Sequence, residues 1–172
     1  MIKLLGAAMV ILAGTLAGWI QARRFAVRPQ EIRRLILSLQ RLDTEIGYGF
    51  IPLPEALRRI GAQSREPLNR LYNEAAEAME APRNWTAQDS LHYALQENWK
   101  FTSMKAQERE VLHQLAFTLG TSDRANQKTH IQSAVKALEA EEAQALEEQA
   151  RYEKMCRSLG LLIGAFIVIL IY

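Results

Sequence analysis

Two uninterrupted apolar runs lie at the ends of the chain and frame a middle in which apolar positions recur with helical periodicity. Residues 4–20, LLGAAMVILAGTLAGWI, carry no charge and as a helix reach roughly 25 Å, just enough for a slightly thin bilayer core. Residues 159–172, LGLLIGAFIVILIY, are shorter and need the preceding turn to reach about 27 Å. The pattern predicts transmembrane helices at residues 1–22 and 159–172.

Basic residues flank both runs on the side that faces the middle of the chain. They are Arg23, Arg24, Arg28, Lys154 and Arg157. Because positive charge resists translocation, both runs predict a cytoplasmic middle and two termini outside. A cleaved signal peptide is the alternative for the first run, although only Lys3 precedes it. A half-inserted or interfacial helix is the alternative for the second run, although that run lacks a polar face.

Each apolar run also contains two glycines that are four residues apart. These are Gly14 and Gly18 in the first run, and Gly160 and Gly164 in the second. Small residues at this spacing let helix backbones approach closely in lipid. Glycine is also common in membrane helices without such a role, so packing and composition both remain open.

The middle of the chain reads as a succession of amphipathic helices. Apolar residues at intervals of three and four predict helices over residues 29–46, from residue 54, over residues 67–79, from a cap at Thr86, and up to residue 119. Thr86 and Asp89 have the spacing of a capping box. No strand pattern competes, so the fold class is all-α, with a bundle of about five to six helices over residues 23–138.

A polar segment joins this bundle to the second apolar run. From Asp123 nothing breaks the helix before Gly160, and residues 139–154, EAEEAQALEEQARYEK, are polar almost all round. Their high helix propensity favours a helix over a disordered linker. We therefore predict a solvated helical stalk over residues 139–158, leading into the membrane.

Composition and motifs give no sign of catalysis. The chain has 21 basic and 19 acidic residues, so it lacks the basic excess of a nucleic-acid binder. It contains no phosphate-binding loop, and the single Cys156 excludes an internal disulfide and a multi-cysteine metal site. Cys156 could accept a palmitoyl group, and the alternative is a small apolar residue at the membrane boundary. His92, His113 and His130 lack metal-site spacing, and Glu108 and Glu110 are expected to be solvated. We expect no enzyme, no cofactor and no metal.

Several short segments, taken in order, carry a family resemblance. They are Arg23-Arg24, LDTEI at 42–46, PLPEAL at 52–57, LGTSD at 119–123, residues 127–132, and EKMCRSLG at 153–160. Together they span the chain and resemble the stage III sporulation protein AB family of endospore-forming bacteria. That family is similar to the cytoplasmic domain of the platform protein of type II secretion and type IV pilus machines.

The resemblance implies a membrane scaffold in the complex that links the mother cell to the forespore. It implies a location in the mother-cell membrane around the forespore, and it implies docking of the sporulation ATPase, stage III sporulation protein AA. Ring-forming components of the complex and a homo-oligomer are further expected partners. Candidate docking or shape-setting residues are Pro52, Pro54, Glu55, Leu57, Gly120, Ser122 and Asp123. A purely structural role as helix boundaries is the alternative for all of them.

Two other functions remain open. A general secretion or pilus platform would usually have two copies of the cytoplasmic domain and three membrane helices, whereas this chain shows one copy and two apolar runs. A membrane-anchored adaptor, sensor or enzyme of another kind would need a pocket with converging polar groups.

Overall fold

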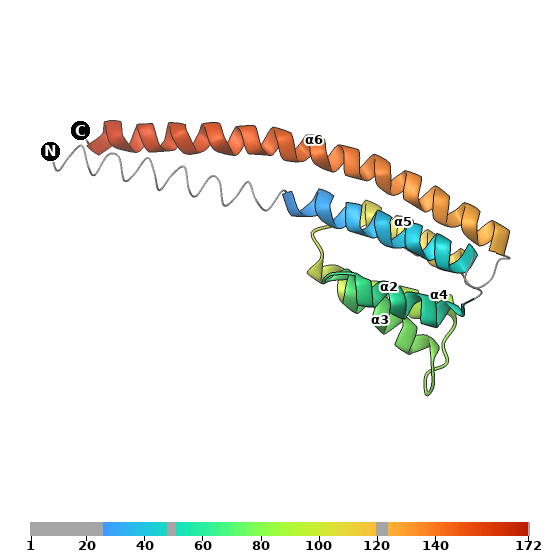
Figure 1. The fold of residues 1–172 in the computed structure, drawn as a ribbon. Coiled ribbons are helices and arrows are strands. Elements are labelled where there is room, and N and C mark those ends of the chain that lie inside the picture. Colours follow the sequence, from blue (N-terminus) through green and yellow to red (C-terminus); the bar gives the residue numbers. More distant parts are fainter. Residues whose placement is uncertain (1–25, 48–50, 120–123, 172) are drawn as a thin grey trace. The chain divides into compact units, whose positions relative to one another are not determined.

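The computed structural model describes residues 26–47, 51–119 and 124–171, and every regular element among them is helical (Figure 1). The prediction of an all-α fold is therefore confirmed for the described residues. By contacts the chain divides into two compact units, Gln30–Glu142 and a second unit of Met1–Pro29 with Ala143–Tyr172.

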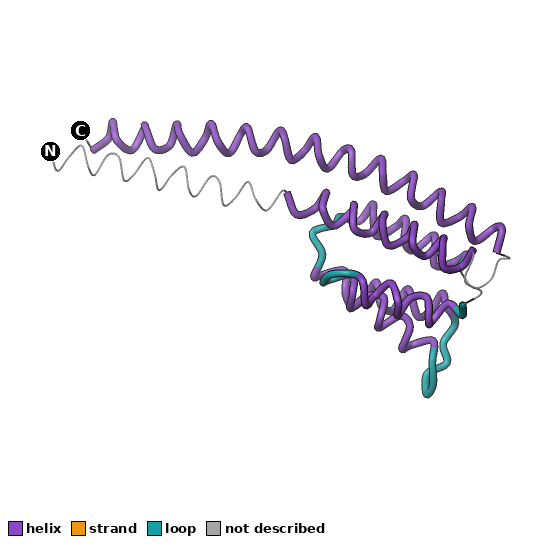
Figure 2. The backbone as a smooth tube through the Cα atoms, viewed as in Figure 1, coloured by secondary structure: helices purple, strands orange, loops and turns teal. Residues whose placement is uncertain are grey.

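The helices follow the predicted order along the chain (Figure 2). They are residues 26–47, α2 (Leu53–Gln63), α3 (Leu68–Met79), α4 (Ala87–Asn98), the 3-10 helix η1 (Trp99–Phe101), α5 (Ala106–Thr118) and α6 (Arg124–Ile171). The described part of the first helix already includes residues 26–28, before Pro29, and η1 was not predicted. Apart from these differences, the helices that periodicity predicts are present.

Local residue chemistry explains where the helices begin. Pro52 is the N-cap of α2 and Pro54 lies in its first turn, where a missing backbone N–H costs nothing. The Thr86 hydroxyl accepts a hydrogen bond from the backbone N–H of Asp89 at 3.1 Å, which confirms the predicted cap of α4. The predicted stop at Gly120 and cap at Ser122 lie outside the described residues, as does Asp123.

The core of the Gln30–Glu142 unit is built from leucine, isoleucine and alanine at the predicted spacings. Helix α2 packs on α3, α3 on α4, and α4 on α5. Its largest fully buried apolar side chains are Ile32, Leu35, Leu39, Leu42, Leu57, Ile60, Leu68, Leu71, Leu95, Ile131 and Leu138. Fully burying one such side chain stabilises the fold by about 1.5–3 kcal/mol, so this cluster supplies the main driving force for folding.

The 26–47 helix and the first part of α6 run antiparallel in this unit. Near one end, Gln132 donates a hydrogen bond to Asp43 at 3.3 Å. Towards the other end, Arg33 and Glu142 form an ion pair at 3.8 Å. The residue numbers therefore rise along one helix as they fall along the other.

Asn98 is buried at the end of α4, with 1% of its surface exposed, whereas the next residue, Trp99, is half-buried. One side chain of the bundle differs from what the sequence indicated. Glu108 was expected to be solvated and is instead 0% exposed. Its carboxylate accepts a hydrogen bond from the backbone N–H of Lys105 at 2.7 Å, which stabilises the start of α5.

The predicted polar stalk is part of one continuous helix, α6, of 48 residues. It is not solvated all round, because Ala145 is 2% exposed and Glu148 is only half-exposed. One side of the helix is packed at these positions, because alanine and a paired glutamate can pack where a free charge cannot.

The two apolar runs are described to different extents. The first run, with Gly14 and Gly18, lies outside the described residues, whereas the backbone of the second run is helical to Ile171 as part of α6. The side-chain surroundings of Gly160 and Gly164 are not among the described features. Over the described ranges, no helix combines the length and the apolar character that crossing a membrane requires.

Candidate functional site

The candidate docking or shape-setting residues at 52–57, called the elbow below, include both buried and exposed side chains. Leu57 is 0% exposed and belongs to the core, whereas Pro52 and Glu55 are exposed. Glu55 accepts a hydrogen bond from Arg59 at 2.7 Å, one turn later on α2. Pro52, Pro54 and Leu57 thus shape the start of α2, and Glu55 is the member of this set best placed to meet a partner.

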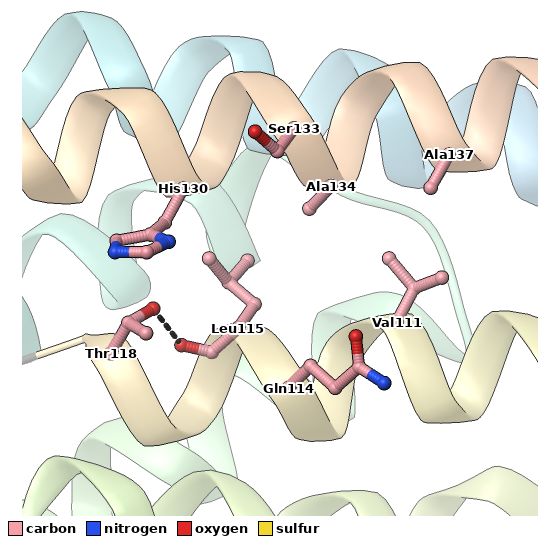
Figure 3. A pocket seen from close by; sticks show the side chains of 8 residues that line it. All are labelled: Val111, Gln114, Leu115, Thr118, His130, Ser133, Ala134 and Ala137. Carbon is pink, nitrogen blue, oxygen red and sulfur yellow. Dashed lines mark hydrogen bonds between the residues drawn. The ribbon is translucent and has the colours of Figure 1, made fainter.

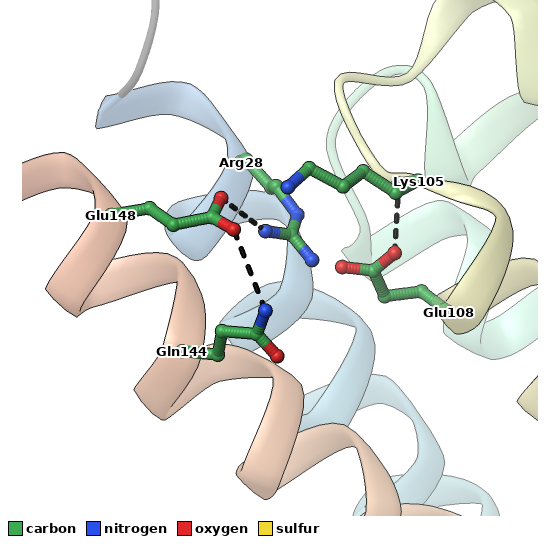
Figure 4. A network of polar contacts seen from close by, with 5 residues as sticks. All are labelled: Arg28, Lys105, Glu108, Gln144 and Glu148. Carbon is green, nitrogen blue, oxygen red and sulfur yellow. Dashed lines mark hydrogen bonds and ion pairs between the residues drawn. The ribbon is translucent and has the colours of Figure 1, made fainter. Parts of the chain in front are cut away.

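The predicted membrane-side charges are only partly described. Arg23 and Arg24 lie outside the described residues, Lys154 is exposed on α6, and the side chain of Arg157 is not described. The Arg28 side chain is 8% exposed and donates a hydrogen bond to Glu148 at 2.9 Å, so it is not an exposed surface charge (Figure 4). The Gln144 amide reaches the other oxygen of the same carboxylate at 3.5 Å.

A groove of about 150 Å³ lies between the 26–47 helix and the end of α2. Arg34, Leu37 and Arg41 line it from the helix, at spacings that put them on one face. Gln63, Ser64 and Arg65 complete the lining. Arg41 donates a hydrogen bond across the groove to the Gln63 side-chain oxygen at 3.2 Å. Leu37 is 49% exposed, so a large apolar side chain lies open between the arginines.

The floor of this groove is held by a buried pair of hydroxyl groups. The Ser38 hydroxyl lies within hydrogen-bond distance of the Tyr72 hydroxyl on α3 and of the Leu35 carbonyl oxygen, 2.7 Å away. Burial raises the pKa of Tyr72 to about 12, although the bond to Ser38 acts in the opposite direction. The pair joins the 26–47 helix to α3 and fixes the helix turn that carries Leu37.

Glu31 is a buried carboxyl group one turn before Arg34. It is 6% exposed, and one of its oxygens accepts a hydrogen bond from the backbone N–H of Ser103 at 2.6 Å. Burial raises its pKa, while the Ser103 bond and the charge of Arg34 act to lower it. Glu31 therefore joins the 26–47 helix to the segment before α5.

An aromatic cluster marks the connection between α3 and α4. The ring of Trp85 meets the ring of Tyr93 edge-on, with centroids 5.3 Å apart. The Arg83 guanidinium lies 5.2 Å from each of these two ring centres. Trp85 is 41% exposed, so the cluster presents tryptophan, tyrosine and arginine, the types enriched among residues that dominate protein interfaces.

The structure brings together two of the three histidines, which sequence spacing did not predict. The ring centroids of His92 on α4 and His113 on α5 are 4.6 Å apart, and Phe117 contacts His92 edge-on. Burial, followed by the charges of His92 and Arg109, lowers the pKa of His113. Within the described part of the chain, no group of three or more side chains could hold a metal ion.

His130 lies apart from this pair, in a groove of about 160 Å³ between α5 and α6 (Figure 3). Leu115 and Val111 point into this groove from α5, and small residues of α6 face them. The lining carries no charged carboxylate or arginine. This groove can accept a small apolar side chain, but it has no polar groups that converge on one point.

Three comparisons with known proteins all point to the same family. The chain matches the family described as Stage III sporulation protein AB (spore_III_AB) over residues 3–172. It is 38% identical over 171 residues to Stage III sporulation protein AB of Bacillus subtilis (strain 168), with 99% of each chain covered. A solved structure titled Stage III sporulation protein AB (SpoIIIAB) is 36% identical and superimposes with a TM-score of 0.68. That match covers 73% of this chain and 98% of the solved chain.

Proposed function

Because this chain belongs to the stage III sporulation protein AB family, we propose that it is a membrane scaffold of the sporulation complex and docks a cytoplasmic ATPase. The observation that carries the proposal is the match along nearly the whole chain, which spans both apolar runs and the middle between them. The expected ATPase is stage III sporulation protein AA, and other components of the same complex are further partners.

The proposal includes membrane anchoring at both ends. Two uncharged runs at residues 4–20 and 159–172, each with basic residues on the inner side, support two anchors and a cytoplasmic middle. The location would be the mother-cell membrane around the forespore, with both termini outside. Gly14 with Gly18, and Gly160 with Gly164, are the proposed positions of close helix packing.

The proposed activity is binding rather than catalysis. The helical bundle offers exposed surfaces of the kind that proteins use to bind one another, namely arginines around Leu37 and the cluster of Trp85, Tyr93 and Arg83. Helix α6 runs without a break from the bundle into the second apolar run, so an ATPase held at the bundle would have a helical connection to the membrane.

Complementation tests the sporulation role. This chain would be expressed in Bacillus subtilis that lacks its 38% identical relative, and heat-resistant spores would be counted. We expect spore formation to be restored to well above the level of the empty vector. The strain without either protein should stop after engulfment. Normal sporulation of that strain would contradict the proposal.

A binding experiment tests the docking step. The full-length chain in detergent would be mixed with purified stage III sporulation protein AA, and the affinity and the melting temperature would be measured separately. A variant with Pro54→Ala and Glu55→Ala tests the elbow. Reduced affinity at an unchanged melting temperature would support docking there. A lower melting temperature with retained affinity per folded molecule would assign these residues to folding alone.

A further inference from the structure

The groove around Leu37 brings three arginines together on one surface of the bundle. Four arginines elsewhere, Arg28, Arg33, Arg58 and Arg59, form ion pairs with glutamates. Arg34, Arg41 and Arg65 share one groove, and no carboxylate in the described part of the chain lies within ion-pair distance of any of them. In a chain with a net charge of only +2, this is a local positive surface.

The apolar part of the groove limits what can bind there. Leu37 lies between Arg34 and Arg41 on one helix face and is 49% exposed. An apolar centre rimmed by arginine is a common arrangement in protein interfaces, because the centre loses water on binding and the rim pairs with charges. The groove volume of about 150 Å³ suits one or two side chains rather than a folded loop.

The spacing of the arginines distinguishes an extended acidic segment from a single phosphate group. Arg34 and Arg41 are seven residues apart, which is about 10 Å along a helix axis. A phosphate needs donors that converge on one point, whereas Arg34 and Arg41 start from backbone positions about two helical turns apart along the groove. Carboxylates that lie two helical turns apart on a partner would match the spread.

We infer that this groove is a docking site for an acidic helical segment of a partner protein, with an apolar side chain between two carboxylates. The inference rests on the proposed scaffold role, because it names the surface through which the scaffold would bind a protein. The apolar side chain would contact Leu37, and the carboxylates would pair with Arg34 and Arg41. Arg65, from the connection between α2 and α3, would add a third charge at the edge.

A synthetic peptide tests the chemistry directly. The probe is a blocked, alanine-rich helical peptide with one leucine, and with glutamates one turn before and one turn after it on the same face. Its control replaces both glutamates with glutamine. Binding to the full-length chain in detergent would be followed by fluorescence polarisation at low and high salt. We expect the glutamate peptide to bind, the glutamine peptide not to bind, and salt to weaken binding.

Variants of the full-length chain locate the contact. We expect Arg34→Gln, Arg41→Gln and Leu37→Ala each to weaken peptide binding about fivefold or more. Arg33→Gln is the matched control, because it removes a neighbouring positive charge whose partner is Glu142. All four positions are at the surface or half-exposed, and melting temperatures would verify that the variants fold. An equal loss with Arg33→Gln, or no loss with the groove variants, would overturn the inference.

Two further outcomes separate this inference from its rivals. Short-chain phosphatidylglycerol would be titrated as a second probe. If it bound the groove and the acidic peptide did not, the groove would be a lipid site and the inference would fail. The ATPase experiment would be repeated with the Arg34→Gln, Arg41→Gln double variant. Unchanged ATPase binding would overturn the groove as the docking site and leave the proposed function intact. Peptide binding without any ATPase binding would support the groove as a docking site and overturn the proposed docking of the ATPase.

Discussion

The buried hydroxyl pair beneath the groove gives the sharpest prediction for the fold. Ser38 and Tyr72 are 2% and 3% exposed, and their hydroxyl groups are hydrogen-bonded. The Ser38 hydroxyl donates its hydrogen to the Leu35 carbonyl oxygen, 2.7 Å away. The Tyr72 hydroxyl must then donate to Ser38. The two residues are therefore not equivalent, and removing one hydroxyl differs from removing the other.

The expected costs follow from what each substitution leaves behind. Ser38→Ala leaves the Tyr72 hydroxyl buried without its partner, which costs about 1–3 kcal/mol of the free energy of unfolding. Tyr72→Phe leaves Ser38 still donating to Leu35, so only the net hydrogen bond is lost, about 0.5–1.5 kcal/mol. In the double variant no hydroxyl is stranded, so the total cost should fall below the sum of the two by about 0.5–1 kcal/mol.

Thermal and chemical unfolding of the full-length chain would measure this cycle. For a unit of this size, each kcal/mol corresponds to roughly 3–6 °C in melting temperature. Additive costs, or a larger cost for Tyr72→Phe than for Ser38→Ala, would refute the assigned donor direction.

Three other substitutions probe separate features. Burial raises the pKa of Glu31 above its ordinary 4.5. The stability that protonated Glu31 contributes should therefore be lost as pH rises from about 4.5 through the folded pKa. Glu31→Gln can still accept the hydrogen bond from Ser103, so melting temperatures of this variant should lack that pH dependence. A Cβ at Gly61 would lie 2.5 Å from the Asn73 side-chain oxygen, so Gly61→Ala should destabilise the chain. In an Asn73→Ala background the same change should stabilise it by roughly 1 kcal/mol through helix propensity. Thr86→Ala should cost about 1 kcal/mol in urea unfolding, because it removes the cap of α4.

The order of helices could be predicted because each helix has a local cause. Apolar spacing marks the faces that carry Leu35, Leu57 and Leu71, and all three are buried in the structure. Proline and threonine mark where α2 and α4 begin, and this chemistry acts within one turn of the chain. The short helix η1 was missed because three residues are too few for a periodic pattern.

The buried polar side chains could not be predicted, because their partners are distant in sequence. Glu31 bonds to Ser103 from 72 residues away, and Ser38 reaches Tyr72 across 34 residues. Nothing in the spacing of His92 and His113 indicates that their rings meet. A polar residue in an amphipathic helix is normally solvated, so periodicity assigns it to the surface unless a tertiary contact decides otherwise.

The groove around Leu37 shows how a nearly neutral sequence can still carry a charged docking surface. Counting 21 basic against 19 acidic residues argues against a nucleic-acid binder, but net charge is a sum over the whole chain. Several glutamates that balance the sum are paired on other surfaces, as Glu80 is with Arg58 and Glu142 with Arg33. Those pairs leave Arg34, Arg41 and Arg65 together in one groove. Because docking responds to the charge within about a Debye length, this local imbalance, and not the neutral total, determines which partner segment the bundle can bind.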